Sequence, residues 1–127
     1  MDPADYDPRY LEGIERFNRQ DFFEAHQIWE EVWLEQEGST KDFYKGIIQV
    51  AIGLHHFRNG KTRGTRKLYF SSRKYLQEYL PQFLGIDVGR LLGEMETCCA
   101  EVANSEEQVP SGRFVPEQAP VIELGAS

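Results

Sequence analysis

The chain has 127 residues, of which 40% are hydrophobic and 28% charged, and its net charge is −7. This length suits one domain with a single core, and the aromatic content is too high for a disordered chain. The negative charge disfavours nucleic acid as a general partner, and no apolar run approaches the ~20 residues that a membrane-spanning helix needs. The acidic N-terminus lacks the apolar segment of a secretory signal, so we expect a cytoplasmic protein.

The spacing of apolar residues predicts five helices, and two of them lie in the N-terminal third of the chain. The first helix begins after Asp7, a favourable N-cap, and runs to about Asn18. The second helix begins at Asp21, which would form a capping box with Glu24, and Gly38 ends it.

The third helix is expected to lie in the middle of the bundle. Thr40 or Asp42 caps it, Gly60 ends it, and its residues 46–57 are apolar nearly all round. A helix of this kind is surrounded by other helices. The short link at 37–41 makes the second and third helices an antiparallel hairpin.

Two further helices follow. Thr62 begins the fourth helix, which Pro81 stops, and Asp87 caps the fifth. Cys98 and Cys99 lie on the apolar stripe of the fifth helix, and neighbouring residues in a helix lack the geometry of a disulfide. We expect two buried thiols.

Helical periodicity ends near residue 104. We therefore divide the chain into a helical bundle domain, residues 1–103, and a proline-containing extended tail, residues 104–127, packed on its own or a neighbouring subunit. The residues expected to hold the tail are Phe114, Val115, Val121, Ile122 and Leu124. The predicted fold is all-α: a single five-helix bundle with a central antiparallel helical hairpin and an extended C-terminal tail.

The charges are distributed unevenly along the chain. Residues 1–42 have a net charge of −8, residues 43–77 of +8, and residues 78–127 of −7. One interpretation is that a basic middle segment packs beside acidic ends. The other is an anion site at the start of the fourth helix, where backbone N–H groups are exposed. The candidate residues for this anion site are Lys61, Arg63 and Arg66.

A polar and aromatic seam is predicted between the second and third helices. His26, Glu30 and Trp33 share one strip, because helical positions four and seven apart lie on the same side. Gln49 and His56 share a strip of the third helix. Buried polar groups need partners, so we expect Gln49 and His56 to form hydrogen bonds with His26 and Glu30.

Three interpretations of this seam remain open. The first is a structural hydrogen-bonded network that fixes the packing of the hairpin. The second is a small-ligand pocket lined by Trp29, Trp33, Gln49 and Gly53. The third is a divalent metal site, with His26, Glu30 and His56 as weak candidates. Because the His-Glu-x-x-His and paired Glu-x-x-His motifs are absent, we expect no metal and no other cofactor.

Whether the chain is an enzyme stays open. His26 or His56, assisted by Glu30, could act as the general base of a hydrolase-type enzyme. No nucleophile accompanies them, and His55 should point about 100° away from His56, as a surface or second-shell residue. The main interpretation is a structural or small-ligand-binding module. We expect a small ligand or an anion as partner, self-association into a homo-oligomer, and neither nucleic acid nor membrane.

An ordered series of motifs between residues 10 and 80 resembles the domain-of-unknown-function 309 family of small bacterial and archaeal proteins. The motifs are Phe17-Asn18, Asp21-Phe-Phe-Glu-Ala-His26, Glu30, Trp33, Gly46-Ile-Ile-Gln49-Val-Ala, His56, Gly60 and Arg63-Gly64. The resemblance implies an all-α bundle and no particular activity. The site residues that it implies are His26, Glu30, Trp33, Gln49, His56 and Gly64, the last allowing close packing of the third and fourth helices. Gln27 and Lys61 depart from the family pattern, which has Glu and Asn there.

Overall fold

The computed structural model describes residues 5–125, and its helices follow the predicted order. They are α1 (Pro8–Asn18), α2 (Phe22–Glu35), α3 (Gly38–Arg58), α4 (Thr62–Leu76) and α5 (Val88–Asn104). The predicted all-α class is confirmed. None of these helices is long and apolar enough to cross a membrane. Of the bundle and tail segments proposed above, residues 1–4 and 126–127 lie outside the described residues.

The predicted helix caps are confirmed at α1 and α5 and wrong at α2 and α3. Asp7 and Asp87 each accept a hydrogen bond from a backbone N–H of the first turn that follows, at 2.8 and 2.9 Å. Asp21 precedes α2, but its side chain makes no capping bond. Glu24 pairs with Arg16 of α1 at 3.1 Å instead of closing a capping box.

The link between α2 and α3 is shorter than predicted, because α3 begins earlier in the chain. We expected Thr40 or Asp42 to cap α3, but the helix begins at Gly38. Gly38 has a φ of +65°, a conformation that glycine adopts without steric cost. It therefore opens α3 after a short link instead of ending α2. Gly60, with a φ of +75°, follows the end of α3 as predicted.

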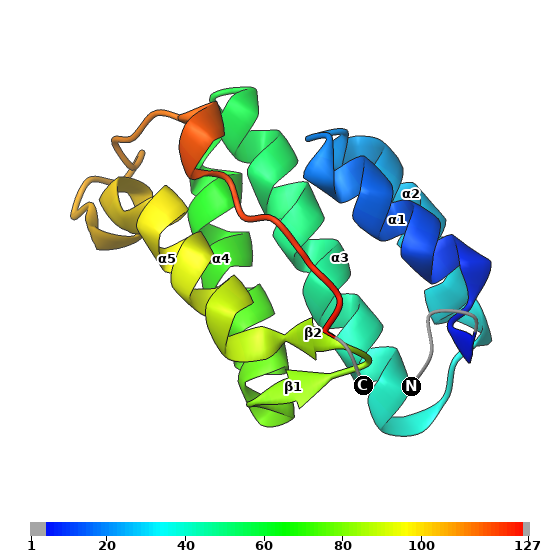
Figure 1. Ribbon diagram of the computed structural model, residues 1–127. Helices are drawn as coiled ribbons and strands as arrows, with labels where there is room; N and C mark the ends of the chain where they lie inside the picture. Colours follow the sequence, from blue (N-terminus) through cyan, green and yellow to red (C-terminus); the bar gives the residue numbers. More distant parts are fainter. Residues whose placement is uncertain (1–4, 126–127) are drawn as a thin grey trace.

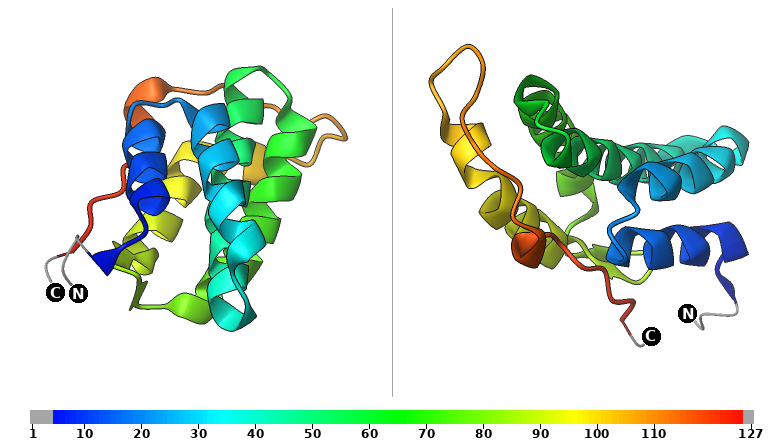
Figure 2. Two further views of the ribbon diagram at one scale, coloured as in Figure 1. Left: turned by 90° about the vertical axis from the view of Figure 1, so that its right-hand side faces the viewer. Right: turned by 90° about the horizontal axis from the view of Figure 1, so that it is seen from above.

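The five helices form two layers. α2, α3 and α4 lie side by side with α3 in the middle, and α1 and α5 lie in front of them (Figure 1). Seen from above, α1, α5 and the C-terminal segment occupy one side, and the three-helix layer occupies the other (Figure 2). The predicted antiparallel hairpin of α2 and α3 is thus confirmed. We call the side of the α2–α3–α4 layer that faces away from α1 and α5 the outer face.

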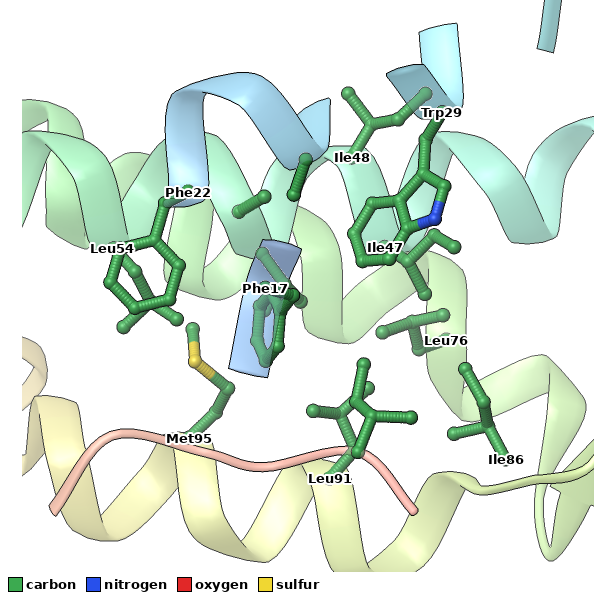
Figure 3. Close-up of a cluster of buried hydrophobic side chains, with 14 of the residues drawn as sticks. Phe17, Phe22, Trp29, Ile47, Ile48, Leu54, Leu76, Ile86, Leu91 and Met95 are labelled. Atoms are coloured by element: carbon green, nitrogen blue, oxygen red, sulfur yellow. The ribbon is translucent and has the colours of Figure 1, made fainter. Parts of the chain in front are cut away.

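The hydrophobic core lies between the two layers. Figure 3 shows side chains from every helix converging there: Phe17, Phe22, Trp29, Ile47, Ile48, Leu54, Leu76, Ile86, Leu91 and Met95. Trp29 is fully buried, and its indole N–H donates to the Tyr10 carbonyl at 3.1 Å. Its ring lies directly against Gly13 of α1. Both cysteines are free and buried on α5, as predicted.

A small β-hairpin that we did not predict joins α4 to α5. After a 3₁₀ turn at Gln77–Tyr79, β1 (Gln82–Phe83) pairs antiparallel with β2 (Ile86–Asp87). The two residues between the strands have positive φ angles, +48° at Leu84 and +79° at Gly85. This is the backbone of a type I′ turn, whose first position usually holds Asn, Asp or Gly. Leu84 gives no such signal in the sequence.

The C-terminal segment crosses from α5 to α1 and runs over α3 (Figure 1). Asn18 of α1 both donates to the carbonyl and accepts from the N–H of Ile122, each at 2.8 Å. The Val121 N–H donates to Glu94 of α5 at 3.1 Å, while Phe114 packs on Phe22 at 6.0 Å between ring centroids. The segment therefore ties the first helix to the last within one chain.

Replacing Gly13 with Ala should destabilise the fold, because the new methyl group would overlap the Trp29 indole ring. We expect a loss of about 1–3 kcal/mol in the free energy of unfolding, measured by urea denaturation. Gly93 of α5 is the matched control, since a methyl group there meets no atom within 4 Å. Gly93→Ala should instead stabilise by about 0.5–1 kcal/mol. Equal stabilities of the two variants would contradict this packing.

Replacing Asn18 with Ala should release the C-terminal segment from α1, because two hydrogen bonds to Ile122 are lost. We expect the free energy of unfolding to fall by about 1–3 kcal/mol, and amide exchange at Ile122 to accelerate. Asn104, an exposed residue without a side-chain hydrogen bond to the described residues, provides the control. An unchanged exchange rate at Ile122 in Asn18→Ala would show that the segment is held by other contacts.

Candidate functional site

His26 lies at the edge of the outer face, where α2 meets α3. Its side chain is 14% exposed, and its Nδ1 lies 2.7 Å from the Phe23 carbonyl oxygen. Since that oxygen accepts only from a donor, Nδ1 carries the proton. Nε2 lies 3.6 Å from Glu30 Oε2, so the pair becomes an ion pair when the imidazole is protonated.

His55, and not His56, faces α2. The Phe23 ring lies between two histidines, with centroid distances of 5.0 Å to His26 and 5.1 Å to His55. We expected His55 to be a surface or second-shell residue, and it lies half-buried beside the Phe23 ring, which also contacts His26. His56 instead lies on the side of α4, where its ring packs against Gly64. Gly64 therefore permits close packing of α3 and α4, as expected.

The predicted hydrogen-bonded network between α2 and α3 is also wrong. Gln49 Oε1 and Trp33 Nε1 are buried but have no hydrogen-bond partner among the described residues. Neither Gln49 nor His56 bonds to His26 or Glu30 through its side chain. Trp33 lies near the opposite end of the hairpin, where the Lys41 ammonium sits 4.7 Å from its ring.

Two residues of the predicted ligand pocket face protein atoms. Trp29 belongs to the core, and a Cβ added to Gly53 would lie 3.3 Å from Leu68 of α4. The space beside Gly53 therefore admits the neighbouring helix. A hollow of about 340 Å³ lies instead at the start of α4. Its lining residues are Gly60, Lys61, Thr62, Arg63, Gly64 and Val109.

The three candidate anion ligands separate into two groups. Lys61 and Arg63 are exposed and line the hollow at the start of α4. Arg66 points to the other side, where its guanidinium donates to the carbonyls of Ser105 and Glu107, each at 3.1 Å. Arg66 therefore holds the turn after α5 and does not line the hollow with the other two candidates.

The histidines are not accompanied by a metal-binding group or by a nucleophile. Within residues 5–125, no three His, Cys, Asp or Glu side chains are grouped so that they could hold a metal, and His26, Glu30 and His56 form no such group. Ser72 donates its hydroxyl to the Tyr69 carbonyl at 3.1 Å, and the cysteines are buried on α5.

Positive charge surrounds the histidine pair on α3. Burial lowers the pKa of His55, and the neighbouring His56, Arg58, His26 and Lys61 lower that pKa further. Nε2 of His55 lies 3.2 Å from the Asn59 amide nitrogen, while Nδ1 is buried without a partner in the described part of the chain. We call Phe23, His26, His55, His56 and Asn59 the histidine cluster.

Comparison with known proteins identifies relatives of the segment that carries the histidine cluster. The sequence model of the family described as Domain of unknown function (DUF309) matches residues 10–68, which include α2, α3 and the start of α4. The matched residues carry most of the motifs on which the resemblance rests. The resemblance inferred from the motifs is thereby confirmed, and the family description assigns no activity.

Two relatives are themselves uncharacterised. The chain is 34% identical over 101 residues to the Uncharacterized protein YpuF of Bacillus subtilis (strain 168), a match that covers 76% of this chain and 58% of that protein. It is 31% identical over 94 residues to an Uncharacterized protein of Aquifex aeolicus (strain VF5), covering 72% of this chain and 28% of that protein. The chain thus spans only part of the length of these relatives.

The folded protein should lose stability as the pH falls through the range from about 7 to 5. A lowered pKa of His55 in the folded state means that the unfolded chain, with a pKa of about 6.5, binds the proton first. Urea denaturation at several pH values measures this slope. In His55→Gln the slope should be smaller, and an unchanged slope would show that His55 is not held neutral.

Proposed function

We propose that this protein is a binding module for a small anionic ligand, and that the histidine cluster and the start of α4 form its site. The observation that carries the proposal is the gathering of cationic groups around His55. Besides burial, the groups that lower the pKa of His55 are the cations Arg58 and Lys61 and the imidazoles of His56 and His26. Among residues 5–125, Glu30 pairs only with His26, and its side chain is half-exposed. An anion bound here would offset the mutual repulsion of these groups.

The start of α4 supports the same ligand class. The first backbone N–H groups of a helix have no partner within the helix and carry a partial positive charge. Lys61 precedes α4 and supplies no capping bond. The hollow of about 340 Å³ next to these groups is large enough for a small ligand. Lys61 and Arg63 on its rim would attract an anion.

Phe23 extends the site toward an apolar or aromatic part of the ligand. Its side chain is 47% exposed although it lies between two histidine rings. An exposed ring held on both sides offers a flat surface for stacking at little conformational cost. A ligand with a planar group and a negative charge would use both parts of the cluster.

The proposal also covers the location of the protein and the alternative of a hydrolase-type reaction. Free, buried cysteines fit a reducing compartment, so we include a cytoplasmic location. A hydrolase-type reaction with His26 or His56 as general base has less support, because the cysteines and Ser72 are buried elsewhere. The histidines therefore serve better as ligands for an anion than as part of a catalytic pair.

Inorganic phosphate provides the test of this site. We expect phosphate to shift the ¹H–¹⁵N resonances of His55, His56 and residues 62–64, and to bind more tightly at pH 6 than at pH 8. Protonated imidazole gains from the anion, so binding raises the pKa of His55 toward its ordinary value. Titration by NMR spectroscopy at both pH values gives the dissociation constants.

Two variants separate this site from general attraction to positive charge. Lys61→Ala and His55→Asn should each weaken phosphate binding by about tenfold, the loss expected for a charged hydrogen-bonding group. Arg113→Ala removes an exposed positive charge from the C-terminal segment and should leave binding unchanged. Chloride at the same ionic strength should cause no shifts. Absence of any shift at millimolar phosphate would overturn the proposal.

A further inference from the structure

The outer face carries a second feature, a row of exposed residues along α4. Arg63, Lys67, Phe70 and Lys74 follow one another at spacings of four, three and four residues, so they share one side of the helix. All four are exposed, whereas the buried residues of α4 lie on the opposite side. We call these four residues the basic strip.

The cations of the basic strip are not used inside the molecule. Within residues 5–125, no carboxylate forms an ion pair with Arg63, Lys67 or Lys74. The other two arginines of α4 are engaged: Arg66 holds the turn after α5, and Arg73 pairs with Glu96 of α5 at 3.6 Å. Internal packing therefore does not account for the charge of the strip.

Phe70 gives the strip an apolar centre. Its side chain is 53% exposed between Lys67 and Lys74, and its ring packs edge-on against buried Tyr69 at 5.0 Å between centroids. The ring is thus held in place before any partner arrives. A fixed aromatic side chain surrounded by cations is the arrangement of a protein interface, where the aromatic anchors and the charges select the partner.

We propose that the basic strip docks an acidic amphipathic helix of another protein. From Arg63 to Lys74 the strip is about 16 Å long, which corresponds to three turns of a partner helix. Carboxylates at the same spacings on that helix would meet the three cations, and an apolar side chain between them would pack on Phe70. Charge complementarity with the three cations and the single apolar contact with Phe70 define this partner helix.

A long polyanion and a second copy of this chain fit the strip less well. Glu78 lies one turn beyond Lys74 and lines a hollow with it, so an extended phosphate backbone would meet repulsion there. Face-to-face docking of two copies would bring the two basic strips together as like charges. Lys45, which lies 5.3 Å from the Tyr75 ring of α4, would add to this repulsion.

A synthetic peptide tests the proposal on the intact chain. The probe is a helical peptide of about 18 residues with Glu at spacings of four and seven and one Leu between them. A control peptide has Gln in place of Glu. We expect fluorescence anisotropy to show binding of the acidic peptide that weakens with salt, and no binding of the control peptide.

Three variants locate the binding surface. The double variant Lys67→Glu/Lys74→Glu should weaken binding by about tenfold or more, and Phe70→Ala by about fivefold with an unchanged salt dependence. Arg113→Glu, on the C-terminal segment, should bind like the unchanged protein. Since all these side chains are exposed, circular dichroism should show an intact fold.

Several results would overturn the proposal. One is failure of the acidic peptide to bind, and another is equal weakening by Arg113→Glu and the double variant, which would reduce the effect to net charge. Tighter binding of a single-stranded oligonucleotide or of phosphatidylglycerol vesicles, lost in the same double variant, would assign the strip to a nucleic acid or a membrane instead.

Discussion

The enclosure of α3 is the constraint on which the rest of this structure depends. Its apolar side chains point in nearly every direction, so it must be covered on both flanks and from beneath. Gly46 and Gly53 let α4 approach one flank closely, and α2 covers the other. α1 and α5 lie in front of the inner side (Figure 1). Only the outward strip of α3 is left for polar residues. The histidines and the basic strip therefore share one face of the molecule.

The helices were predictable because their signals are local: apolar spacing, capping by Asp7 and Asp87, and the glycine at position 60. The orientation of α3 was not. We placed Gln49 and His56 opposite α2, although Gly46 and Gly53 mark the flank that another helix approaches most closely. Because α4 takes that flank, the neighbouring positions turn outward and His55 meets Phe23. The spacing of the glycines was the signal that would have placed the histidines.

Other parts of the site depend on contacts between residues far apart in the sequence. Arg66 resembled an anion ligand because its residue type and its neighbours are basic. Its actual partners are backbone carbonyls of a turn about forty positions later. Every residue has a backbone carbonyl, so residue type does not reveal which carbonyl accepts such a bond. Trp29 is similar, since its N–H bonds to the backbone of Tyr10. Sequence patterns identify the polar side chains, but backbone partners decide which of them remain available for a ligand.

The pairing of Asn18 with Ile122 also sets an order of events during folding. The α2–α3–α4 layer is built from neighbouring segments and gains its contacts early, as short sequence separations favour. α1 also packs on α2, its neighbour in the sequence, so it can join this layer early. The two hydrogen bonds between Asn18 and Ile122 are different, because they join residues 104 positions apart. Closing so long a loop costs more chain entropy, so we expect these bonds to form after the local contacts. Until they form, the C-terminal segment leaves apolar surface of the core uncovered.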